Sequence, residues 1–292
     1  MFYEIDLPQR KPGVKPTAAL VVLNPAESRR LLARAVVATP EVKWAWQNGT
    51  IIIARGITSA FVTEELLNIK VEHKANQTVG FVGGGMTNAN GSPPASTWHV
   101  IRKGKVVENA DTNVEIQSFM PGDLFIKGAN AVDHTGASGV WVASRKAGSI
   151  GMAWPILAPR GCDMLVTVSL EKLIPSVEEA SRHSGIYHFR YSMGIPCRLV
   201  PESLAKVITE IQAFGILAGV RAYHVGSGGI AGSEGSVQLC LEGDEASLAK
   251  AFEVAKSVKG EPPVGMPAKP FLSKPADYGY DAQAQLDLLG GI

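Results

Sequence analysis

Apolar positions along the chain change between helical spacing and short continuous runs, a pattern typical of α/β proteins. Asn24 and Pro25 precede a run at helical spacing, which predicts a helix that begins there and ends before Pro40. Residues 50–54 are mostly β-branched with almost no polar interruption, which predicts a strand covered on both faces, as in a parallel sheet. A turn of small residues and a helix over 60–67 follow. This strand–turn–helix unit is typical of a doubly wound fold.

The middle of the chain contains more strand-like segments. Residues 78–82 and 123–127 predict strands, and residues 99–108 predict a hairpin that turns at residues 103–104. We therefore expect residues 1–190 to form an α/β domain with a Rossmann-like, mostly parallel sheet and helices on both faces. Its remaining expected elements are a short strand, a helix, a strand and a short helix, over 140–143, 148–157, 163–169 and 176–183.

The pattern changes near residue 191. The order of elements expected there is strand, helix, strand, strand and helix, an order that resembles a ferredoxin-like module. We expect residues 191–260 to form this smaller α+β domain, and residues 261–292 to form a Pro-rich, extended C-terminal tail. Because ferredoxin-like units often pair through their sheets, we also expect a homo-oligomer. The elements are expected over residues 197–200, 202–218, 220–225, 236–242 and 244–258.

Composition narrows the classes of function. The 292 residues include 28 Lys and Arg against 27 Asp and Glu, and this balance provides no broad basic surface for nucleic acid. The apolar stretch 150–158 is shorter than the ~20 residues of a membrane helix, and Pro155 interrupts it. Three scattered cysteines and six histidines without HxH or HxxxH spacing indicate neither disulfides nor a metal site. We expect a cytoplasmic protein with no cofactor, no nucleic-acid partner and no membrane partner.

Three segments, taken in order, resemble the superfamily that contains ribose-5-phosphate isomerase, glucosamine-6-phosphate deaminase, CoA-transferases and translation initiation factor 2B subunits. Residues 51–61, IIIARGITSAF, resemble the strand and Gly/Ser/Thr turn that holds substrate phosphate in the isomerases. Residues 122–133, GDLFIKGANAVD, resemble the strand end of ribose-5-phosphate isomerase and a stretch of the initiation-factor group. The helix at 148–157 and the strand at 163–169 resemble the elements that follow. The resemblance implies a crevice for a small anionic metabolite of the sugar-phosphate kind.

Residues at the first strand end are candidates for binding the anion. Arg55, Gly56, Thr58 and Ser59 lie where backbone N–H groups and a helix dipole favour negative charge. An ordinary tight turn with Ser59 as N-cap is the alternative. Gly84, within a run of three glycines, is a further candidate for wrapping a ligand, although a flexible loop explains the run as well.

A second group of candidates follows the strand at 123–127. Asp133 is the candidate general base, with Lys127 or His134 as its acidic or electrophilic partner. Gly128 and Asn130 are expected to contact substrate. The alternative is a capped turn with a surface ion pair.

The sequence also departs from the isomerases. Lys127 and Asn130 stand where the isomerases have acids, and neither their catalytic lysine segment nor the CoA-transferase glutamate motif has a counterpart. Three functions remain open: an isomerase-like enzyme acting on a phosphorylated sugar, a non-catalytic ligand-sensing or assembly protein of the initiation factor 2B type, and a CoA-transferase-like activity.

Overall fold

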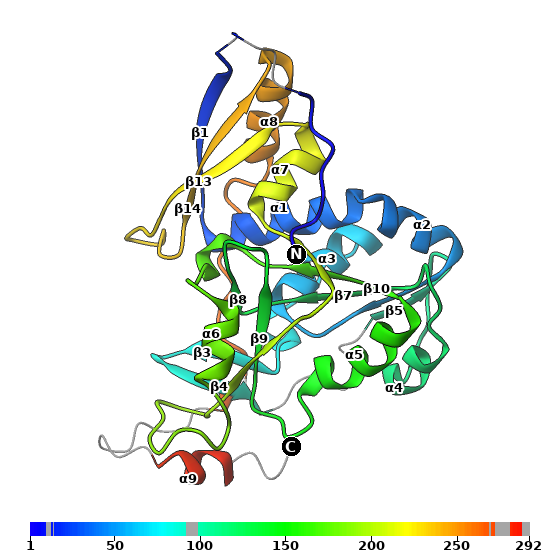
Figure 1. Ribbon diagram of the computed structural model, residues 1–292, viewed down its shortest axis with the longest axis vertical. Helices are drawn as coiled ribbons and strands as arrows, with labels where there is room; N and C mark the ends of the chain where they lie inside the picture. Colours follow the sequence, from blue (N-terminus) through cyan, green and yellow to red (C-terminus); the bar gives the residue numbers. More distant parts are fainter. Residues whose placement is uncertain (10–12, 14, 92–98, 269, 272–280, 288–292) are drawn as a thin grey trace.

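A six-stranded mixed sheet forms the centre of the molecule in the computed structural model, which describes residues 1–9, 13, 15–91, 99–268, 270–271 and 281–287 (Figure 1). In spatial order the strands are β12 (Ala205–Ile208), β10 (Asp163–Thr167), β7 (Leu124–Gly128), β2 (Thr50–Ile53), β5 (His99–Arg102) and β6 (Lys105–Val106). Counted across the sheet and not along the chain, the first four neighbouring strands are parallel to one another. The two strands at the other edge, β5 and β6, are antiparallel to their neighbours. The chain is therefore a mixed α/β protein.

Two apolar cores cover the two faces of this sheet. All four residues of β2 are buried; Ile51 and Ile53 belong to one core, whereas Ile52 belongs to the other. This division follows from the alternation of side chains along a strand. The first core holds α1 (Pro25–Ala38), α2 (Pro40–Asn48) and α3 (Ile57–Leu67), and the second holds α5 (Gly148–Arg160).

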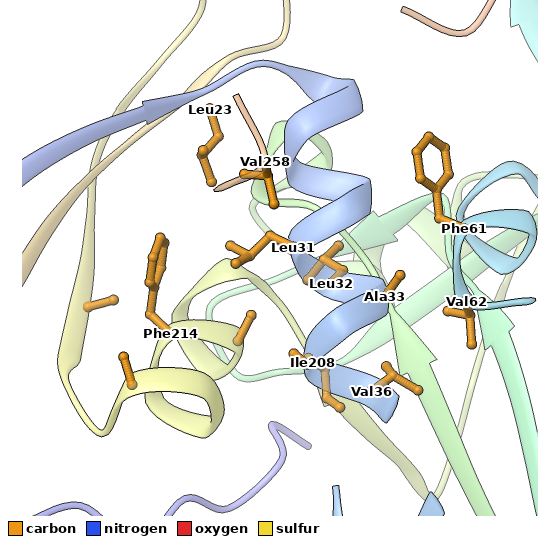
Figure 2. Packing of buried hydrophobic residues seen from close by; sticks show 14 of the residues in the cluster. Leu23, Leu31, Leu32, Ala33, Val36, Phe61, Val62, Ile208, Phe214 and Val258 are labelled. Atoms are coloured by element: carbon orange, nitrogen blue, oxygen red, sulfur yellow. The ribbon is translucent and has the colours of Figure 1, made fainter. Parts of the chain in front are cut away.

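Helix α1 joins the central sheet to a second sheet. It begins as predicted: Asn24 accepts hydrogen bonds from the backbone N–H groups of Ala26 and Glu27, and Glu27 accepts one from the N–H of Asn24. Figure 2 shows Leu31 and Leu32 of α1 between Phe214 on one side and Phe61 and Val62 of α3 on the other, all in one core. Burial of these side chains holds the two sheets together.

The second sheet is antiparallel and has the order β1 (Thr17–Leu23), β14 (Val237–Gly243), β13 (Arg221–Ser227). Helices α7 (Glu210–Ala218) and α8 (Glu245–Ser257) pack against it, at the upper end of Figure 1. Strand β1 was not expected, because its short apolar segment directly follows a Pro-rich stretch at the start of the chain.

Two small antiparallel sheets complete the architecture. One has the order β11 (Arg198–Pro201), β9 (Ser138–Val142), β8 (Ala131–Val132), and the other the order β15 (Pro270–Phe271), β4 (Met86–Asn90), β3 (Gly80–Gly83). The remaining helices are α4 (Thr112–Glu115), α6 (Val177–Arg182), α9 (Ala282–Asp287) and the 3₁₀ helices η1 (Lys74–Gln77), η2 (Ile116–Ser118) and η3 (Leu170–Lys172).

Most of the expected elements are confirmed within a few residues. The hairpin turns at Lys103 and Gly104, whose φ angles of 47° and 74° suit a two-residue hairpin turn. The helix expected over 202–218 is confirmed only in part: it ends at Ala218 as expected, but α7 begins only at Glu210, because Ala205–Ile208 forms β12 alongside β10. Pairing with a buried parallel neighbour outweighs the weak local preference for helix.

The strand expected at 197–200 is present as β11, but it pairs with β9, and β1 stands beside β14. The expected division near residue 191 stays a prediction, although both pairings cross it. The Rossmann-like and ferredoxin-like descriptions also stay predictions. Residues 272–280 and 288–292 of the expected tail lie outside the described residues. No helix in the described part of the chain is long and apolar enough to cross a membrane.

Candidate functional site

The carboxyl ends of β2, β7, β10 and β12 meet at one edge of the central sheet, because these four strands are parallel. Helix α3 begins shortly after β2 ends, and α7 begins two residues after β12 ends. Ligands of open α/β sheets bind at such edges, where helix N-termini present unpaired N–H groups. The edge is therefore the candidate site.

The first predicted group lies in the turn between β2 and α3. Helix α3 begins at Ile57 with Gly56 as its N-cap, so Ser59 is a residue of the first helical turn and not the cap. Gly56 has a φ of 157°, a backbone conformation that residues with a side chain rarely adopt. The cap carries no side chain, so no side-chain oxygen caps the first N–H groups of α3.

Ser59 lies in a small pocket at this helix start. Its side chain is buried, and its Oγ makes no hydrogen bond to any described residue. Gly56, Gln77 and His99 line the same pocket, which we call the α3 pocket. Burial lowers the pKa of His99, so its ring is neutral near pH 7 and can donate or accept a proton. A buried hydroxyl without a partner indicates a place where water or ligand atoms bind.

Two more residues of the turn lie beside the α3 pocket. Arg55 precedes Gly56 and is partly buried, and burial lowers the pKa of its guanidinium. Thr58 is buried, and its Cβ would lie 4.0 Å from a Cβ placed on Gly128. The turn after β2 and the end of β7 are thus in contact, as the sequence predicts for neighbouring parallel strands.

Lys127 forms a buried ion pair at the end of β7. Its Nζ donates to Oε1 of Glu202 and, at 2.8 Å, to the carbonyl oxygen of Gly128. Only 3% of the Lys127 side chain and none of the Glu202 side chain is exposed. Lys127 does form an ion pair, but the pair is buried, so the alternative of a surface ion pair is wrong. Oε2 of Glu202 has no hydrogen-bond partner among the described residues.

Lys172 and Glu210 extend this group of charges. Nζ of Lys172 donates to the carbonyl oxygen of Ala129 at 3.0 Å, and burial together with the nearby charge of Arg29 lowers the pKa of Lys172. Burial raises the pKa of Glu210, whose Oε2 accepts from the N–H of Leu170 at 2.9 Å. Shifted pKa values of this kind gather at functional sites and in structural ion-pair networks alike.

Sequence analysis missed these additional residues. The sequence could have indicated that Glu210 lies at a helix start, because Thr209 and Gln212 form a capping box that marks the beginning of α7. Lys172 and Gln77 lie in the short 3₁₀ helices η3 and η1, where nothing in the sequence distinguishes them from surface residues.

Asp133 serves the local fold. Its Oδ1 accepts from the N–H and hydroxyl of Thr135 at 2.9 and 2.6 Å and from the N–H of Ala137 at 3.3 Å. Its Oδ2 accepts from the N–H of Val177, the first residue of α6, at 2.9 Å. Burial alone would raise the pKa of Asp133, but these hydrogen bonds lower it below its usual value. A carboxylate held in this way is a weak proton acceptor.

The remaining predicted residues do not gather at one point. Asn130 accepts from the N–H of Trp141 at 3.0 Å and so supports the β8–β9 hairpin. His134 is exposed, and Gly84 lies in the exposed turn between β3 and β4 with a φ of 61°. The structure therefore brings Arg55, Gly56, Thr58, Ser59 and Gly128 together and leaves Gly84 and His134 on the surface.

Comparisons of the chain with models of protein families, with curated proteins and with solved structures each found no match. Within the described residues, no group of three or more His, Cys, Asp or Glu side chains is arranged to hold a metal ion. Cys162, Cys197 and Cys240 are all free thiols. Burial raises the pKa of Cys197 to about 12, which makes this thiol a poor nucleophile near pH 7.

Proposed function

We propose that the protein binds a small anionic metabolite of the sugar-phosphate kind at the α3 pocket. The observation that carries the proposal is the buried Oγ of Ser59, which has no partner among the described residues and lies beside the N-cap glycine of an 11-residue helix. The uncapped N–H groups of α3 favour negative charge at this point, and Arg55 of the same turn adds a positive charge to this part of the chain. The pocket has a volume of about 10 Å³, room for about one water-sized group, so it would take a single phosphate oxygen while the rest of the ligand lies outside it.

Isomerase-like chemistry is the catalytic form of this proposal. Aldose–ketose interconversion moves a proton between two neighbouring carbons, so it requires a group that accepts a proton and returns it. His99 is the one titratable residue among the described residues that line the α3 pocket, and its ring is neutral near pH 7, so it is the candidate for this role, although its lowered pKa weakens it as a base. The resemblance of residues 51–61 to the phosphate turn of the isomerases also supports this form.

A non-catalytic ligand-sensing protein is the second candidate. It is favoured by the hydrogen bonds of Asp133 and by the ion pair of Lys127, which leave neither predicted catalytic side chain in position to move protons. In this case the ligand would bind in the α3 pocket without being converted. CoA-transferase-like activity has no comparable observation in its favour.

Calorimetric titration of the full chain with ribose 5-phosphate, inorganic phosphate and ribose tests the proposal. We expect both phosphates to bind and ribose not to bind. Replacement of Ser59 by Ala should weaken phosphate binding about tenfold, the usual effect of losing one hydrogen bond to a charged group.

Thr63→Val provides the matched control. Thr63 also lines the α3 pocket, but its hydroxyl donates to the carbonyl oxygen of Ser59 inside the helix, so it is not offered to a ligand. Unchanged affinity in Ser59→Ala, or an equal loss in both variants, would reject the α3 pocket. NMR of the bound sugar phosphate over time then separates an isomerase from a sensor.

A further inference from the structure

A second concave surface lies away from the α3 pocket and shares no lining residue with it. It is a groove of about 390 Å³ between the end of β9, the loop that precedes α5, the loop that follows α6, and β11. Its volume is in the range of pockets that hold small molecules. We call it the arginine groove, after Arg145, Arg182 and Arg198.

Three arginines from three separate segments line the groove. Arg145 precedes α5, Arg182 ends α6 and Arg198 begins β11, and all three are exposed. Arg145 and Arg198 form no ion pair with a residue that the structure describes. Arg182 pairs with Glu178 at the surface, and such exposed pairs contribute little, so an incoming anion can replace the carboxylate.

The rest of the described lining contains no Lys, Asp or Glu and is largely apolar. Val142 and Val200 belong to the apolar core or pack against it, and Ile186 adds a third aliphatic side chain. Two rings, those of Tyr187 and His188, also line the groove, and both residues are exposed. None of the described residues that line the groove is acidic. Planar guanidinium groups match phosphate oxygens in pairs, whereas aliphatic and aromatic side chains match the faces of a flat ring.

The start of α5 also favours an anion in the arginine groove. Ala147, which lines the groove, is the N-cap of this 13-residue helix, and no side chain caps its first N–H groups. The positive end of the helix dipole therefore lies next to the arginines. Ser144 accepts a hydrogen bond from the N–H of Lys146 at 3.3 Å, so its own hydroxyl can donate to an anion.

We propose that the arginine groove binds a nucleoside phosphate, with its phosphates on Arg145, Arg182 and Arg198 and its base against Tyr187, His188 and the aliphatic floor. This site is separate from the α3 pocket and does not depend on the function proposed there. The chemistry that favours a nucleotide over a sugar phosphate is the combination of three guanidinium groups with a ring-sized apolar surface.

Calorimetric titration of the full chain with adenosine 5′-diphosphate, inorganic pyrophosphate and adenosine tests this inference. We expect the nucleotide to bind at least about tenfold more tightly than either of its parts, because the groove contacts both. Arg145→Gln and Arg198→Gln should each weaken nucleotide binding by about tenfold or more. Ser59→Ala should leave it unchanged, which separates this site from the α3 pocket.

Lys146→Gln is the matched control. Lys146 is the neighbour of Arg145, is exposed and carries the same charge, but it does not line the groove. It should change affinity less than about twofold. An equal loss of affinity in Lys146→Gln and Arg145→Gln would show that unspecific charge attraction, and not the arginine groove, binds the nucleotide. Equal affinity for pyrophosphate and nucleotide would show that the base makes no contact with the groove. No binding at ~5 mM nucleotide, or much tighter binding of single-stranded RNA than of the nucleotide, would also overturn the proposal.

Discussion

The carboxyl edge of the central sheet and the arginine groove both concentrate charge, but they hold it differently. At the edge, Lys127 is buried with Glu202, and Asp133 is buried among N–H donors. In the groove, Arg145 and Arg198 are exposed and form no ion pair with a described residue. Charges that the fold already neutralises contribute to the structure, whereas charges left at a concave surface are available to a ligand. The two regions should therefore respond in opposite ways to the removal of charge.

The largest effect is expected from Lys127→Met. This change leaves the Glu202 carboxylate buried without its partner, which costs about 3–5 kcal/mol of unfolding free energy. Urea unfolding of the variant and the parent protein measures the loss. The double variant Lys127→Met/Glu202→Met is the control, because it removes both charges and should recover most of the stability. A single variant as stable as the parent would show that the pair is not buried in solution.

A smaller effect is expected from Asp133→Ala. The change leaves the N–H groups of Thr135, Ala137 and Val177 without their acceptor, at a cost of about 2–3 kcal/mol. The effect should depend on pH. Because the folded-state pKa of Asp133 is lowered, its contribution is fully present above the unfolded pKa of about 4 and is lost as pH falls through the folded value.

Unfolding at a series of pH values checks this dependence. The parent protein should lose stability more steeply than Asp133→Ala as pH falls below about 4, and the two curves should converge in acid. Replacement of the exposed neighbour His134 by Ala should leave the acid limb of the curve unchanged. Parallel curves for the parent and Asp133→Ala would contradict the assigned hydrogen bonds.

Local signals predicted most individual elements but not their partners. Asn24 and Pro25 mark the start of α1, and the apolar run at 50–54 marks β2, because caps and strand burial are recorded in neighbouring residues. The pairing of β1 with β14 joins residues more than 200 positions apart, and no local pattern records it. The same limit placed the start of the helix at 202–218 too early, because contact with β10 makes residues 205–208 a strand.

The candidate site shows the same limit. The small residues after the apolar run at 50–54 predicted that Gly56 and Ser59 lie at a strand end, and in the structure these two residues are in contact as expected. The hydrogen bonds of Asp133 to Thr135 and Ala137 are local and agree with the capped turn given as the alternative. No local pattern shows the bond from Val177 to Asp133 or the pairing of Lys127 with Glu202, because these partners lie 44 and 75 positions apart. The arginine groove was not anticipated for the same reason, since its three arginines come from separate elements.

The smallest effect on stability is expected from Arg198→Gln, and it sharpens the comparison. Arg198 is exposed on β11 and has no carboxylate partner among the described residues, so its replacement should change the free energy of unfolding by less than about 0.5 kcal/mol. Urea unfolding without ligand measures this difference, with Lys127→Met in the same series as the opposite extreme. A loss of more than about 1 kcal/mol would place Arg198 among the structural charges. An unchanged stability, combined with weaker nucleotide binding, would assign its charge to a ligand, because the fold would then gain nothing from keeping it.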